Sequence, residues 1–181
     1  MEFEGKVAIV TGATSGIGMA TTLRLIEQGA RVAAVGRRKE VLAKVARQNI
    51  KTYAVDLTSQ QETAAFAKRV LEDFGGIDVL VNAAGIIASG TIENTTLADY
   101  DLMMNINVRS VFQLSQLAHP SIIERKGNIV IVSSVTGIRA FPNVFAYCVS
   151  KAAVDQLTRC AALELAPKGA LLKLTRKTAA C

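Results

Sequence analysis

The stretch KVAIVTGATSGIG (residues 6–18) decides the fold class. A short apolar run, VAIV, leads into a loop that contains three glycines, and the pattern MATTLRLIEQGA that follows is helical. A strand that is apolar at every position is typical of a parallel sheet covered on both faces. Glycines between such a strand and a helix allow a tight turn and a close approach of backbone N–H groups to a phosphate. We therefore interpret the stretch as a strand, a dinucleotide-binding loop and the start of a helix.

The same alternation of strand and helix continues along the chain. Four further apolar runs predict strands, namely RVAAVG (31–36), KTYAVD (51–56), IDVLVNAAG (77–85) and NIVIVSS (128–134). Helical patterns are expected at about 16–29, 38–48, 59–74, 97–124 and 145–166. Five strand–helix units in succession predict an α/β fold, a Rossmann-type doubly wound parallel sheet in a three-layer α/β/α arrangement.

Composition excludes several classes of protein. The 181 residues suit one domain, and no apolar run approaches the roughly 20 residues that span a bilayer. The formal net charge of +6 is concentrated after residue 167, where four basic residues and no acid occur, so a nucleic-acid partner is not expected. The acidic start, MEFEGK, resembles no targeting signal, and three cysteines without metal-like spacing predict no metal site. We expect a cytoplasmic protein without a membrane partner.

The glycine loop supplies the first candidate cofactor contacts. These are Gly12, Thr14, Ser15, Gly16, Ile17 and Gly18. The spacing G-x-x-x-G-x-G departs from the dinucleotide fingerprint G-x-G-x-x-G, so a merely tight turn between strand and helix is the alternative.

The end of the second predicted strand indicates which nucleotide binds. An acidic residue at this position usually binds the ribose 2′-hydroxyl of NAD, but here Gly36 is followed by Arg37 and Arg38. Two guanidinium groups favour a 2′-phosphate, so NADP(H) is the preferred cofactor and NAD(H) remains possible. The alternative is a pair of solvated arginines at a helix start. Asp56, with Leu57 beside it, either accepts a hydrogen bond from the adenine amine or caps the next helix.

Polar residues at the carboxyl edge of the predicted sheet suggest a catalytic site. Tyr147 and Lys151 lie four positions apart, so they share one face of a helix. A nearby ammonium stabilises a phenolate and lowers the pKa of a tyrosine, which suits general acid–base catalysis. Because this spacing is common by itself, a partly buried tyrosine beside a surface lysine is the alternative. Ser133 and Ser134 end the fifth strand and Asn82 ends the fourth, while Asn107 interrupts a helical pattern that it does not favour.

Five motifs in order and spacing resemble those of the short-chain dehydrogenase/reductase family. They are TGATSGIG, NAAG, NINV, IVSS and YCVSK, and the resemblance extends from residue 6 to residue 169. It implies hydride transfer between the nucleotide and a small-molecule carbonyl or alcohol substrate. It also implies that Tyr147 is the acid/base, that Lys151 lowers its pKa and binds the nicotinamide ribose, and that Ser134 binds the carbonyl. Asn107 would hold a water in a proton relay.

The resemblance also identifies further cofactor contacts and a possible assembly. It implies that Asn82, Ala83 and Gly85 of the NAAG segment border the nucleotide, although the family segment usually reads NNAG. Related enzymes commonly associate through the two helices that flank the fifth strand. A homo-oligomer is therefore possible.

The end of the chain departs from the family. We assign residues 1–169 to the dinucleotide-binding domain and residues 170–181 to an atypical basic tail, in which residues 170–174 form a sixth-strand stub. The Pro-Gly turn and the last strand of the family are missing, so a truncated isoform is expected. The alternative to an active oxidoreductase is a catalytically incompetent form that binds nucleotide or pairs with a full-length partner.

Overall fold

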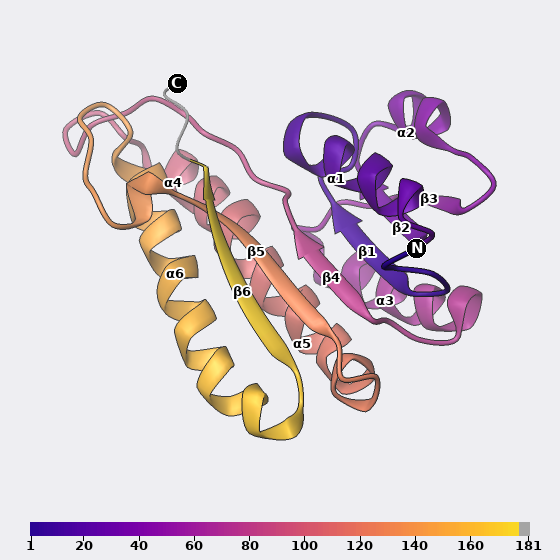
Figure 1. Cartoon of the computed structure of the whole chain (residues 1–181). Coiled ribbons are helices and arrows are strands. Elements are labelled where there is room, and N and C mark those ends of the chain that lie inside the picture. Colours follow the sequence, from indigo (N-terminus) through magenta and orange to yellow (C-terminus); the bar gives the residue numbers. More distant parts are fainter. Residues whose placement is uncertain (178–181) are drawn as a thin grey trace.

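One six-stranded sheet organises the molecule, and each strand runs parallel to its neighbours (Figure 1). The structure, a computed structural model, describes residues 1–177. The strand order is β3-β2-β1-β4-β5-β6. The strands are β1 (Val7–Thr11), β2 (Arg31–Gly36), β3 (Ile50–Ala54), β4 (Val79–Asn82), β5 (Asn128–Ser134) and β6 (Leu171–Lys177).

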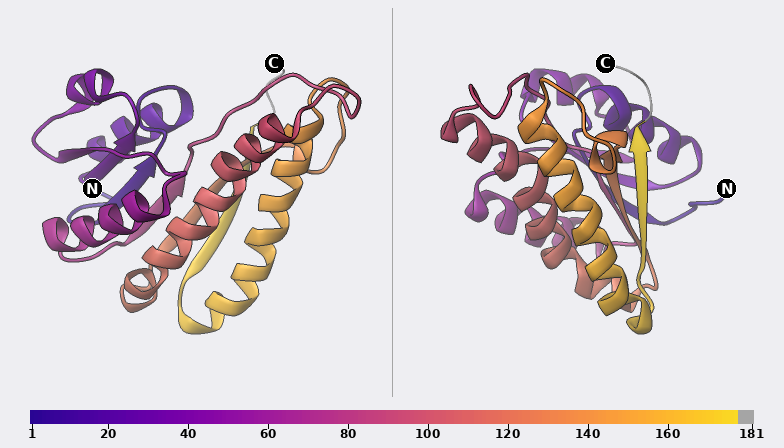
Figure 2. Two further views of the ribbon diagram at one scale, coloured as in Figure 1. Left: turned by 180° about the vertical axis from the view of Figure 1, so that it is seen from behind. Right: turned by 90° about the vertical axis from the view of Figure 1, so that its left-hand side faces the viewer.

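Helices form a layer on each side of the sheet, which confirms the predicted doubly wound α/β/α fold. Two helices, α1 (Gly16–Glu27) and α2 (Lys39–Val45), lie on one face. The other face carries α3 (Gln60–Phe74), α5 (Ser110–Glu124) and α6 (Phe145–Leu165), as seen from behind in Figure 2. The remaining elements are α4 (Leu97–Met104), the π-helical turn η1 (Asn105–Arg109) and the short 3₁₀ turns η2 (Val135–Gly137) and η3 (Ala166–Lys168).

The apolar strands form two cores because successive side chains point to opposite faces. In β1, Val7 and Ile9 pack with α3 and α5, whereas Ala8 and Val10 pack with α1 and α2. All four side chains are at most 1% exposed. Burial on both faces explains why the strand has no polar alternation in the sequence.

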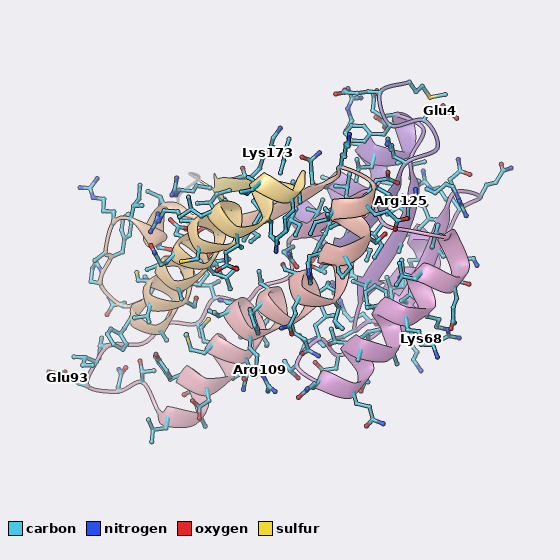
Figure 3. All side chains as sticks on the ribbon, turned by 90° about the horizontal axis from the view of Figure 1, so that it is seen from below. Glu4, Lys68, Glu93, Arg109, Arg125 and Lys173 are labelled. Carbon is cyan, nitrogen blue, oxygen red and sulfur yellow. The ribbon has the colours of Figure 1, made fainter. Side chains whose placement is uncertain are left out.

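Strand β6 is longer than the predicted stub at residues 170–174. It begins at Leu171 and pairs with β5 along its whole length to Lys177. Leu172 and Leu174 pack against the core, whereas Leu171 and Lys173 on the opposite face are exposed. Figure 1 shows this opposite face of β5 and β6 without a covering helix in residues 1–177, and Figure 3 labels Lys173 there. Pairing with β5 and burial of one face therefore order residues beyond the predicted boundary at 169.

The arrangement of helices creates a crevice at the carboxyl ends of the central strands. The chain leaves β1 for one edge of the sheet, through β2 and β3, and returns to β4 on the other side of β1. Ligands of open parallel sheets bind where the strand order reverses in this way. In the described residues 1–177, no helix is both long and apolar enough to cross a membrane.

Candidate active site

The loop after β1 is shaped by glycines that have no room for a side chain. Gly12 has a φ of +66°, and a Cβ there would lie 3.0 Å from Ala84. A Cβ on Gly18 would lie 2.4 Å from the carbonyl oxygen of Gly12. Ser15 is the N-cap residue of α1, but its side chain caps no backbone N–H group. The first turn of α1 therefore offers N–H groups and a partial positive charge to an anion.

The loop opens into a cleft of about 240 Å³ between the ends of β1, β2, β3 and β4. The predicted cofactor residues that line the cleft are Gly12, Thr14, Ser15, Arg37, Arg38, Asp56, Leu57 and Gly85. A larger hollow of about 560 Å³ lies against β3 and α3. It contains none of the predicted site residues, so we place the nucleotide in the smaller cleft, where the helix N-terminus and the two arginines lie.

At the rim of this cleft, Gly36 and Arg38 lie against Thr14 of the glycine loop. A Cβ on Gly36 would lie 2.8 Å from the Thr14 methyl carbon, so a larger side chain there requires the Thr14 side chain to move. Arg38 donates hydrogen bonds from Nη2 to the Thr14 carbonyl oxygen (3.3 Å) and to Thr14 Oγ1 (3.2 Å). The arginine is exposed but fixed at the mouth of the cleft, and Arg37 lines the same wall.

Asp56 is ionised at the opposite wall of the cleft. Its Oδ1 atom accepts hydrogen bonds from the Thr58 backbone N–H (2.9 Å) and hydroxyl (2.7 Å), and these bonds hold the pKa of the carboxyl below its usual value. The N-cap of α3 is Ser59, which accepts a hydrogen bond from the Glu62 N–H. Asp56 is therefore not the N-cap of α3, although its side chain caps the Thr58 N–H in the segment that leads to this helix. The capping-box spacing of Ser59 and Glu62 was the signal for the true cap.

The loop after β4 is fixed by two residues whose roles the sequence did not show. Thr11 Oγ1 accepts hydrogen bonds from the backbone N–H groups of Ala83 and Ala84, both at 2.9 Å. The buried Asn82 side chain donates to Ser115 Oγ in α5 at 3.2 Å. Asn82 thus ties β4 to a helix, and Thr11 ties the loop to β1. Ala83 and Gly85, which follow, remain exposed to the crevice.

Asn107 connects this loop to α6 from within the π-helical turn. Its Oδ1 accepts a hydrogen bond from the Ile86 N–H (2.8 Å), and its Nδ2 donates to the Ile86 carbonyl oxygen (2.9 Å) and to Ser150 Oγ (3.0 Å). The side chain is 1% exposed. Its amide is thus engaged by the protein, so the predicted part in a water relay stays a prediction. π-helical turns are often found at functional sites because they shift the helix register locally.

Tyr147 and Lys151 meet at a smaller cavity of about 140 Å³. Ile17, Ala83 and Gly85 line the same cavity. Lys151 is 6% exposed. Its Nζ donates a hydrogen bond to the Val132 carbonyl oxygen at 2.9 Å and lies 5.6 Å from the centre of the Tyr147 ring. Burial lowers the pKa of Lys151 to about 8, although the nearby Asp155 carboxylate acts in the opposite direction. The ammonium therefore lies beside the Tyr147 ring, on the same cavity.

The two serines at the end of β5 have different environments. Ser134 is the N-cap residue of η2, and its Oγ accepts a hydrogen bond from the Thr136 N–H at 3.2 Å. This bond uses a lone pair and leaves the hydroxyl hydrogen able to donate to a ligand. Ser133 lines the cavity and donates to the buried carboxylate of Asp155. In residues 1–177, no three His, Cys, Asp or Glu side chains gather as metal ligands.

Comparison with known proteins gives the same assignment as this geometry. Residues 6–175 match the profile of the short chain dehydrogenase family. The chain belongs to the short-chain dehydrogenase/reductase family. Among relatives, the 3-oxoacyl-(acyl-carrier-protein) reductase of Thermotoga maritima is 38% identical over an alignment of 173 residues, and the match covers 92% of this chain and 70% of the relative. The resemblance predicted from the five motifs is confirmed, and the chain has the fold of an oxidoreductase family.

Solved structures of the short-chain dehydrogenase/reductase family superpose closely on the chain. A xylitol dehydrogenase bound to NAD⁺ is 34% identical with a TM-score of 0.94, and the match covers 98% of this chain and 72% of that one. A metagenomic short-chain oxidoreductase in complex with NADP is 32% identical with a TM-score of 0.94, and the match covers 99% and 85% of the two chains. Since both nucleotides occur among these structures, the cofactor preference has to be argued from this chain's own residues.

Proposed function

We propose that the protein is an NADP(H)-dependent oxidoreductase that interconverts a small carbonyl compound and the corresponding secondary alcohol. The observation that supports this most directly is the crevice itself, in which the glycine loop, Arg37, Arg38, Tyr147 and Lys151 border two adjoining cavities. The wall common to both cavities is the loop after β4. A nucleotide can thus extend from the arginines to the tyrosine.

The residues of the first cleft fit a dinucleotide with a 2′-phosphate. A Cβ on Gly12 or Gly18 would occupy the space in the glycine loop, which these two glycines leave open for the nucleotide phosphates. The N–H groups at the start of α1 face this space. Gly36 stands at the position where NAD-binding sites usually have an acidic residue, so no carboxylate there opposes a 2′-phosphate. Arg37 and Arg38 would hold the phosphate by charge-assisted hydrogen bonds. Asp56 would accept a hydrogen bond from the adenine amine.

The second cavity places proton donors beside the space for a substrate. When bound, the nicotinamide cofactor supplies or removes a hydride at the carbonyl carbon. The hydroxyl of Tyr147 donates a proton to the substrate oxygen during reduction and accepts it during oxidation. Ser134, which follows the cavity-lining Ser133 at the end of β5, would donate its hydroxyl hydrogen to that oxygen and stabilise the negative charge that develops there. The ammonium of Lys151 favours the phenolate form of Tyr147 and binds the ribose hydroxyls of the cofactor.

Binding measurements test the choice of nucleotide. We expect NADPH to bind more tightly than NADH when both are titrated by nucleotide fluorescence at one fixed salt concentration. Replacing both arginines (Arg37→Ala with Arg38→Ala) should weaken NADPH binding about 10- to 100-fold, because the phosphate loses charged partners, and should leave NADH binding nearly unchanged. Lys173→Ala, which removes an exposed cation from β6, is the control. Tighter binding of NADH by the unaltered protein would refute the proposal.

Turnover tests the role of Tyr147. A screen of small ketones, dicarbonyls and secondary alcohols, followed by nucleotide absorbance, should identify a substrate. In Tyr147→Phe, turnover should fall at least about 1000-fold, since the proton donor is lost, while the dissociation constant of NADPH should change little. Substantial turnover by this variant would remove Tyr147 from the mechanism. Nucleotide binding without turnover in the unaltered protein would instead favour the catalytically incompetent form.

A further inference from the structure

A buried carboxylate lies one helical turn after Lys151 in α6 and is bound from two strands. Asp155 is 1% exposed. Its Oδ1 accepts a hydrogen bond from Ser133 Oγ in β5, and its Oδ2 accepts bonds from Arg176 in β6, at 2.8 Å from Nη2 and 3.2 Å from Nε. A carboxylate removed from water is stable only with hydrogen bonds and a compensating charge. Arg176 supplies that charge, with its own side chain 33% exposed.

This network joins directly to the residues of the second cavity. The paired positions of β5 and β6 are Val132 with Thr175, Ser133 with Arg176, and Ser134 with Lys177. The Val132 carbonyl accepts the hydrogen bond from Lys151 Nζ, so the strand end that β6 fixes also holds the lysine.

Close packing leaves the network little freedom to rearrange. A Cβ on Gly137 would lie 2.9 Å from Asp155 Oδ2 and 2.9 Å from the Lys151 carbonyl oxygen. The 3₁₀ turn η2 therefore packs against both the Asp155 carboxylate and the backbone of α6. A shift of the Asp155 side chain would reach Ser133 and the turn of α6 that carries Lys151.

We propose that Arg176 is a positioning residue of the candidate active site, which fixes the Asp155 carboxylate and through it Ser133 and Lys151. The inference rests on the proposed function in that Lys151 is taken as a catalytic group. It goes beyond that function because Arg176 belongs to β6, in the segment expected from the sequence to be an atypical tail. The arginine acts through Asp155 and is not assigned a contact with substrate.

The charges around Lys151 give the proposal a measurable consequence. The titratable and charged groups that face Lys151 are Tyr147 and Asp155 from α6 and Lys177 from β6, and Arg176 of β6 binds Asp155. The neighbouring side chains from β5 and η1, such as Ser133 and Asn107, are uncharged. The Asp155 carboxylate raises the pKa of Lys151 against the effect of burial. A guanidinium bound to that carboxylate, as Arg176 is, should offset part of the attraction. Removing one or the other charge should therefore move the titration of Lys151 in opposite directions.

Carbon NMR of the lysine side chains tests the proposal without any nucleotide. The protein is labelled at the lysine Cε, and the signal of Lys151 is assigned by its loss in Lys151→Met. Its inflection is expected near pH 8 in the unaltered protein. Arg176→Met should raise the inflection by about one pH unit, because the carboxylate is left unbalanced. Asp155→Asn should lower it, because the attraction is lost. Lys173→Met, which removes an exposed cation from the same strand, should not move it.

The outcomes separate this proposal from the proposed function. In Arg176→Lys, the inflection of Lys151 should return toward that of the unaltered protein. If the inflection in Arg176→Lys equals that in Arg176→Met, the result counts against the positioning role. An inflection unchanged by Arg176→Met, or shifts of the same sign in Arg176→Met and Asp155→Asn, would overturn the proposal. Failure of the unaltered protein to bind NADPH would refute the proposed function. It would not affect the NMR test, because that test is carried out without nucleotide. Loss of NADPH binding only in Arg176→Met would support the positioning role.

Discussion

The buried lysine is the residue at which the demands of stability and of function conflict. Lys151 is 6% exposed and makes one hydrogen bond to a backbone carbonyl, while the ionised form is disfavoured by removal from water. An amine with a pKa of about 8 still carries its charge at neutral pH. Buried charged side chains are common at catalytic sites, although they lower the stability of the folded protein.

We expect Lys151→Met to increase the free energy of unfolding at pH 7 by about 2 kcal/mol, since the cost of burying the ammonium disappears. Between about pH 8 and pH 10.5 the unfolded chain holds a proton that the folded chain has released, so the unaltered protein should gain stability with rising pH. The difference between the two proteins should therefore be largest below pH 8 and shrink above it. Denaturant unfolding at pH 7, 8 and 9.5 measures this trend. A difference that grows with pH would contradict it.

Short elements and their ends show what the sequence could predict and what it could not. The strands were predictable because their side chains are apolar at every position, which only a doubly covered sheet requires. The pattern at 97–124 predicted a continuous helix. The structure has a π-helical turn within it, where Asn107 bonds to Ile86 and Ser150, which are far away in the sequence. Strand β6 likewise extends to Lys177, where it pairs with β5 and where Arg176 binds Asp155, and no local pattern shows these partners.

The same reasoning applies to the candidate site. The motifs brought Tyr147, Lys151 and the glycine loop to one edge, since loops after parallel strands share that edge. They did not reveal that Thr11 fixes the loop after β4 or that Asn82 faces α5. Such assignments depend on which way a side chain turns in the folded protein, and residue type alone leaves that open.

At the scale of one element, the start of α1 provides a sharp test of packing. In Gly18→Ala the new methyl group would come 2.4 Å from the Gly12 carbonyl oxygen, so the glycine loop or the helix must move. We expect a loss of about 1 to 3 kcal/mol in the free energy of unfolding and at least about tenfold weaker NADPH binding. Met19→Ala alters the adjacent, exposed residue of the same helix and should change both quantities little. Equal effects of the two substitutions would show that close approach at Gly18 is unimportant.

The two halves of the molecule are covered unequally. Strands β1, β2 and β3 have helices on both faces, whereas β5 and β6 have α5 and α6 on one face and no helix on the other in the described residues (Figures 1 and 2). The proposed nucleotide site crosses from one half to the other. Its first cleft is lined by residues after β1, β2 and β3, and its second by residues of β5, α6 and β6. A bound nucleotide should therefore stabilise the half that has fewer packing partners.

This arrangement predicts a clear effect of the cofactor on melting of the whole molecule. At about 100 times its dissociation constant, NADPH should add about 2.7 kcal/mol to the free energy of unfolding. For a chain of this size, that corresponds to a rise of roughly 5 to 10 °C in the melting temperature followed by circular dichroism. The same concentration of NADH should give a smaller rise, and the variant with both Arg37→Ala and Arg38→Ala should respond alike to the two nucleotides. If NADPH binding is detected by fluorescence but the β5 and β6 amides gain no protection from hydrogen exchange, the nucleotide does not connect the two halves. Protection that spreads from the glycine loop into β5 and β6 is the result that the shared crevice requires.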